Sequence, residues 1–78
     1  MFNYTPYFEN GVLKKRPYLK KEWCVQAIGN PLKWELQENE RVRLWGKIEN
    51  ADGKFLRVIT LIDRTTIHKA FVDRDFKL

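Results

Sequence analysis

The chain has 78 residues, a length that accommodates one domain (1–78) with a single small hydrophobic core. One cysteine excludes an intramolecular disulfide, and one cysteine with one histidine excludes a structural zinc site, so we expect no metal and no other cofactor. No apolar run approaches the ~20 residues of a membrane span. The formal net charge of +5 favours an anionic partner such as nucleic acid, an acidic protein segment or a membrane surface, and the alternative is surplus lysine that serves solubility alone.

The first six residues are expected to form an arm that precedes a short helix. They lack the basic start and apolar stretch of a signal peptide, so a cytoplasmic location is predicted. The helix is expected from Tyr7 to about Arg16, because Phe8 and Val12 lie four residues apart on one face. Pro17 ends it, since the residue before a proline is pushed out of helical geometry.

A second helix is indicated by apolar residues that recur at the spacing of one buried face. These residues are Leu19, Trp23, Cys24, Ala27 and Ile28. The sequence Gly29-Asn30-Pro31 ends this helix, because glycine or asparagine can take the left-handed cap and proline cannot continue a helix.

From residue 32 the apolar period changes to two, which is typical of strands with one buried face. Four strands are expected, at 32–37, 41–48, 55–62 and 65–74, with short polar turns between them. Short connections make neighbouring strands antiparallel. The sequence therefore predicts an α+β domain in which two N-terminal helices pack on one face of a four-stranded antiparallel meander sheet.

Two groups of basic residues are candidates for contact with phosphate. The first is Lys14, Lys15 and Arg16 at the joint between the helices, although charge runs are commonly only solvated surface. The second is the outer face of the second strand, with Arg41, Arg43 and Lys47 around Trp45, an arrangement typical of proteins that stack single-stranded bases. The alternative is that the C-terminal tail or the N-terminal arm covers Trp45.

The only histidine, His68, lies in the last strand, and its neighbours depend on the register of the last hairpin. If Asp63-Arg64 is a two-residue turn, Ile59 lies opposite His68 and Arg57 lies opposite Ala70, so that Arg57 and His68 share a face. The core face of this hairpin is then expected to consist of Leu56, Val58, Ile67 and Phe71, which leaves Ile59 and Leu61 on the outer face. The alternative is a register shifted by one residue, which places His68 opposite Thr60 and separates it from Arg57.

A histidine beside arginines is the minimum for metal-independent RNA cleavage, in which one group moves the proton and a cation stabilises the phosphorane. In this interpretation His68 is the acid or base, and Arg57 and Arg74 hold the phosphate together with Arg43. The alternatives are a purely structural histidine and a simple surface ion pair between Asp73 and Arg74.

Several short motifs resemble those of a family of small uncharacterised bacterial proteins. They are Tyr4-Thr5-Pro6-Tyr7-Phe8, Arg16-Pro17-Tyr18, Glu22-Trp23-Cys24, Asn30-Pro31, Trp45-Gly46, Leu56-Arg57-Val58, His68-Lys69-Ala70-Phe71 and Asp73-Arg74. The expected order of helices and strands, with Asn-Pro after the second helix, is more distantly similar to the RelE/ParE/BrnT group of toxin-like domains.

That distant similarity implies a toxin-type ribonuclease whose partners are RNA and a small acidic antitoxin-like protein. A non-enzymatic module that binds nucleic acid or protein through its basic face is the alternative. A third possibility is an interaction protein that adds a strand from a partner to a free sheet edge.

Overall fold

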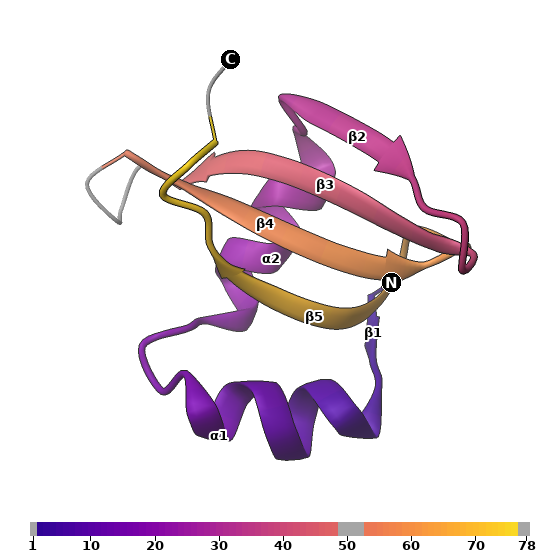
Figure 1. Cartoon of the computed structure of the whole chain (residues 1–78). Coiled ribbons are helices and arrows are strands. Elements are labelled where there is room, and N and C mark those ends of the chain that lie inside the picture. The colour runs from indigo at the N-terminus through magenta and orange to yellow at the C-terminus, as the bar shows by residue number, and fades with distance from the viewer. Residues whose placement is uncertain (1, 49–52, 77–78) are drawn as a thin grey trace.

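The computed structural model describes residues 2–48 and 53–76. The elements in chain order are β1 (Asn3–Tyr4), the π-helical segment η1 (Phe8–Val12), α1 (Leu13–Lys15), α2 (Lys21–Gly29), β2 (Lys33–Leu36), β3 (Arg41–Ile48), β4 (Lys54–Leu61) and β5 (Thr66–Val72). The strands form one five-stranded sheet in the order β1-β5-β4-β3-β2. Figure 1 shows β2 at one edge of this sheet and β1 at the other.

The predicted four-stranded antiparallel meander is wrong, because the sheet has five strands and is mixed. β1 pairs parallel with β5, with Asn3 beside Thr66 and Tyr4 beside Ile67. A strand of two residues is too short to show an alternating pattern, so the sequence predicted only an arm there. The RelE-like architecture is therefore corrected, and the toxin–antitoxin and RNA-binding roles attached to that architecture lose their basis with it.

The helical segments cover one face of the sheet and close a single core cluster. Phe8 and Val12 of η1 and Cys24 and Ala27 of α2 are buried there against apolar side chains of β3, β4 and β5. The first helix begins after Thr5, whose hydroxyl accepts a hydrogen bond from the Phe8 N–H, so one free donor of the first turn is satisfied. In the part of the chain that the structure describes, no helix is both long enough and apolar enough to cross a bilayer.

The last hairpin contains a β-bulge that sets the faces of β5. Thr60 pairs with Ile67, as the predicted turn requires, but Ile59 then pairs with Lys69, and His68 is the extra residue between them. The expected partners Ile59–His68 and Arg57–Ala70 are therefore wrong, and Arg57 lies opposite Phe71.

The bulge exchanges two residues between the core and the outer face. Ala70 is fully buried next to Val58, its partner across the strands, whereas Phe71 shares the outer face with Arg57. The prediction that Phe71 belongs to the core is therefore wrong. The other three expected core residues, Leu56, Val58 and Ile67, are buried.

Candidate functional site

Three cations from three parts of the chain surround the ring of Phe71. The guanidinium carbon of Arg57 in β4 lies 4.9 Å from the ring centroid, and that of Arg16, just after α1, lies 5.8 Å from it. The Nζ atom of Lys69, two residues before Phe71 in β5, lies 5.9 Å away. We call Arg16, Arg57, Lys69 and Phe71 the Phe71 surface; its cations lie within the range in which a ring face attracts them.

A small pocket adjoins the Phe71 surface between the first helix and β5. Its volume is about 130 Å³, and its lining consists of Tyr7, Gly11, Val12, Lys15, Arg16 and Lys69. Three of these six residues are cations. Within residues 2–48 and 53–76, no carboxylate oxygen lies within 4.0 Å of the charged nitrogens of Lys15, Arg16 or Lys69. The pocket is therefore electropositive and suited to a small anion.

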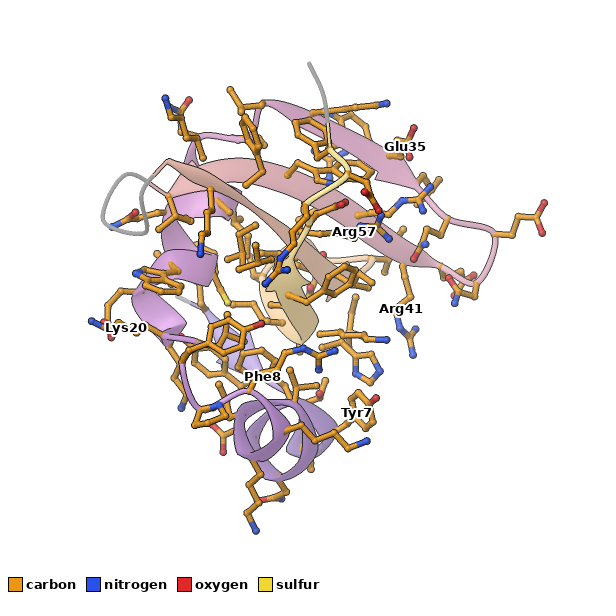
Figure 2. The ribbon with its side chains drawn as sticks, turned by 60° about the vertical axis from the view of Figure 1, so that its left-hand side comes forward. Tyr7, Phe8, Lys20, Glu35, Arg41 and Arg57 are labelled. Atoms are coloured by element: carbon orange, nitrogen blue, oxygen red, sulfur yellow. The ribbon has the colours of Figure 1, made fainter. Side chains whose placement is uncertain are left out.

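Tyr7 forms the aromatic side of this region. Its side chain is about half exposed, at 51%, and its ring stacks on the imidazole of His68 with centroids 4.8 Å apart. Figure 2 shows Arg57 and Arg41 from the sheet and Tyr7 from the start of the helix along the same side of the molecule. An exposed ring beside a cationic pocket is the arrangement that allows a base to stack while its phosphate is neutralised.

The position of His68 follows from the bulge. Its Nδ1 atom lies 3.0 Å from the hydroxyl oxygen of Thr5, and its ring is stacked against Tyr7. Partial burial lowers the pKa of His68 below its ordinary value, and the positive charges of Arg41 and Lys69 lower this pKa further. The imidazole is therefore neutral at neutral pH, with one ring nitrogen engaged by Thr5.

Arg57 is bound to an acidic residue rather than to His68. Its Nε and Nη2 atoms donate to the same carboxylate oxygen of Asp73, at 3.1 and 2.9 Å, and the indole Nε1 of Trp45 donates to that oxygen at 2.9 Å. These hydrogen bonds, with that of Trp45 the strongest influence, hold the pKa of Asp73 below its ordinary value. Arg74 is exposed, and it is Arg57 that pairs with Asp73.

Trp45 points to the predicted outer face but is not free to stack a base. It is only 5% exposed, because Phe76 of the C-terminal segment stacks on it with ring centroids 5.3 Å apart. The guanidinium groups of Arg43 and Arg57 also lie over its ring. The structure thus shows the alternative in which the C-terminal segment covers the indole.

The other basic residues singled out in the sequence lie apart from one another. Arg43 pairs with Glu35 of β2 at 2.7 Å, and its Nε is buried without a hydrogen-bond partner in the described part of the chain. Arg41 is half-buried, whereas Lys47 is exposed. Lys14 is exposed, while Lys15 and Arg16 line the pocket.

The residues that sequence reasoning missed are Tyr7, Lys69 and Phe71. Phe71 was assigned to the core because a regular strand places it there, and the bulge moves it outward. The signal for the bulge was the spacing of apolar residues in β5, because Ile67, Ala70 and Val72 do not follow a period of two.

The chain matches no protein-family model, no curated protein and no solved structure. Among the residues that the structure describes, no three of the types His, Cys, Asp and Glu gather as metal ligands would. The function is therefore inferred from the geometry and charge of the site itself.

Proposed function

We propose that the chain is a non-enzymatic binding module for single-stranded nucleic acid, held by its phosphate backbone at the Phe71 surface and the adjoining pocket. The observation that carries this proposal is the pocket itself, where Lys15, Arg16 and Lys69 converge without a carboxylate partner among the described residues. Such a module would act in the cytoplasm, where the chain is predicted to be.

The chemistry of the site favours an extended strand over a compact anion. A phosphate in the pocket meets Arg16 and Lys69, while the neighbouring nucleotides extend toward Tyr7 on one side and Phe71 on the other. Stacking of one base on an aromatic ring contributes about 1–3 kcal/mol and tolerates any base, because every base has a π face. Bases in a duplex are already stacked on each other, so a single strand is preferred.

Fluorescence anisotropy with a short labelled single strand, and with the duplex of the same sequence, tests the proposal. We expect Lys69→Gln and Arg16→Gln to weaken binding of the single strand, and each to reduce the slope of log K against log salt by about 0.7. The matched control is Lys54→Gln, which removes one positive charge from an exposed position at the start of β4.

Phe71→Leu separates stacking from charge, because it removes the ring and keeps every cation. We expect this variant to bind more weakly with an unchanged salt slope. If Lys69→Gln and Arg16→Gln bind as tightly as Lys54→Gln, the Phe71 surface is not the binding site.

A second candidate function is metal-independent cleavage of RNA, and it is favoured by one observation. The lowered pKa of His68 keeps a neutral imidazole, the form that accepts a proton, beside the cations Arg41 and Lys69. The test is incubation of an RNA strand with the protein in the presence of a chelator, with the DNA strand, which lacks the 2′-hydroxyl, as the control. Cleavage that His68→Gln leaves undiminished would exclude His68 as the base.

A further inference from the structure

The edge strand β2 presents a second surface, on the opposite edge of the sheet from β1 (Figure 1). In the described residues β2 pairs with β3 alone. Glu35 lies opposite Arg43, and the Gln37 N–H donates to the Arg41 carbonyl, so the odd-numbered residues of β2 bond to β3, as does the N–H of Leu32 just before the strand, which donates to the Trp45 carbonyl. The N–H and C=O groups of Trp34 and Leu36 therefore point away from the sheet.

This edge also carries large apolar side chains that the helices do not bury. Trp34 is 49% exposed, Leu36 is 62% exposed and Leu32, just before the strand, is 43% exposed. An edge strand with exposed apolar side chains is a template for pairing with another strand, which proteins ordinarily cover or blunt. β2 has the free backbone groups and the apolar surface that strand pairing requires.

The occupant of this edge is indicated by the charges of β2. Lys33 and Glu35 lie on the outer face, on either side of Trp34, and their side chains are 53% and 38% exposed. The sequence around Trp34 is symmetric in its apolar residues, because Leu32 and Leu36 lie two positions on either side. The residues next to Trp34 carry opposite charges, Lys33 before it and Glu35 after it. Such a segment is complementary to its own antiparallel copy.

We propose that β2 pairs antiparallel with β2 of a second copy of this chain, about a two-fold axis at Trp34. Trp34 then exchanges backbone hydrogen bonds with Trp34 of the partner subunit, and Lys33 faces Glu35 of the partner subunit, with the reciprocal pair across the axis. Leu32 faces Leu36 of the partner subunit on the apolar side. The two five-stranded sheets become one continuous sheet.

The charges select this register over its neighbours. Only every second residue of β2 has backbone groups free to pair with a partner strand, so the partner strand can shift only in steps of two residues. The neighbouring registers therefore have their two-fold axis at Lys33 or at Glu35. A shift to Lys33 places two lysines opposite each other, and a shift to Glu35 does the same with two glutamates. Like charges directly opposite one another destabilise an antiparallel pair, so the Trp34-centred register is preferred.

Sedimentation equilibrium of the full chain, from micromolar to millimolar concentration, tests the proposal. We expect the unchanged protein to dimerise, and Lys33→Glu to raise the dimer dissociation constant by about tenfold or more, since it places glutamates opposite each other twice. Lys54→Glu is the control, because it makes the same change of charge at an exposed position of β4. Circular dichroism verifies that each variant keeps the fold.

A mixing experiment distinguishes strand pairing from a general effect of charge. Glu35→Lys alone places lysines opposite each other and should also be monomeric. An equimolar mixture of Lys33→Glu and Glu35→Lys restores two opposite pairs, so a heterodimer should form where neither variant self-associates. A monomeric unchanged protein at every concentration, a dimer that Lys33→Glu leaves intact, or a mixture that stays monomeric would each overturn the proposal.

Discussion

Gly46 of β3 lies directly against Ala27 of α2. A Cβ atom added to Gly46 would lie 2.5 Å from the Cα and 2.7 Å from the Cβ of Ala27, closer than such atoms approach in proteins. The absence of a side chain at residue 46 therefore allows α2 to pack closely on the sheet, with Ala27 inside the core cluster.

Gly46→Ala should destabilise the protein by about 1–3 kcal/mol, because the helix backbone must move to admit the methyl group. Urea unfolding followed by circular dichroism measures the change. Gly29→Ala is the control, since a Cβ at Gly29 meets nothing within 4 Å, and it should unfold close to the unchanged protein.

Asp73→Ala should cost about 2 kcal/mol or more of unfolding free energy, because it leaves the indole N–H of Trp45 and the guanidinium of Arg57 without their shared acceptor. Asp73→Asn keeps an acceptor oxygen for Trp45 and should cost less. Asp75→Asn, which removes a charge from an exposed neighbour, is the control.

Because the pKa of Asp73 is lowered, its contribution to the stability of the fold depends on pH. The folded state favours the ionised carboxylate, so the stabilisation is complete above the unfolded pKa of about 3.9 and is lost as pH falls through the lower folded pKa. The difference in unfolding free energy between the unchanged protein and Asp73→Asn should therefore be larger at neutral pH than at acid pH. A constant difference between them would show that the charge of Asp73 is not involved.

His68 should make the protein less stable on mild acidification. Its folded pKa is lowered, so the unfolded chain takes up the proton first, and stability is lost as pH falls from above about 6.5 through the lower folded pKa. His68→Gln should flatten the dependence of unfolding free energy on pH in this window. Because His68 is the only histidine, NMR titration of its ring protons gives the folded pKa directly, and a value at or above 6.5 would contradict the prediction.

Cys24 should be inert toward thiol reagents in the folded protein. It is fully buried, and burial raises the pKa of its thiol to about 12. The reactive thiolate is therefore scarce at neutral pH, and reagent reaches the sulfur only when the core opens. A colorimetric thiol assay should show slow reaction in buffer and immediate reaction in denaturant; equally fast reaction in both would place Cys24 outside the core.

The parts of the fold that could be predicted from the sequence are those set by repeated patterns. The apolar spacing of Cys24 and Ala27 predicted the buried face of the second helix, and the alternation from Val42 to Ile48 predicted a strand with one buried face. β1 could not be predicted, because a strand of two residues shows no alternating pattern, and its pairing depends on backbone hydrogen bonds from Asn3 and Thr5 to Thr65 and Ile67.

The candidate site was harder to predict than the fold. Lys15, Arg16 and Arg57 were found from their charge, but their partners Lys69 and Phe71 depend on one extra residue in β5. Trp45 was correctly placed on its face, yet its burial depends on Phe76, which lies far from it in sequence. Alternation reports the face of a side chain and cannot report what covers it.

The bulge at His68 has a consequence for how this sequence can change in length. In a regular strand, the loss of one residue turns every later side chain to the opposite face. Here Ile67 and Lys69 already oppose adjacent residues of β4, so deletion of His68 would leave a continuous ladder with Ala70 and Val72 still facing the core. β5 should therefore tolerate loss of His68 better than loss of Ala70, which would turn Phe71 toward the core, and a homologue one residue shorter at His68 would keep the same sheet.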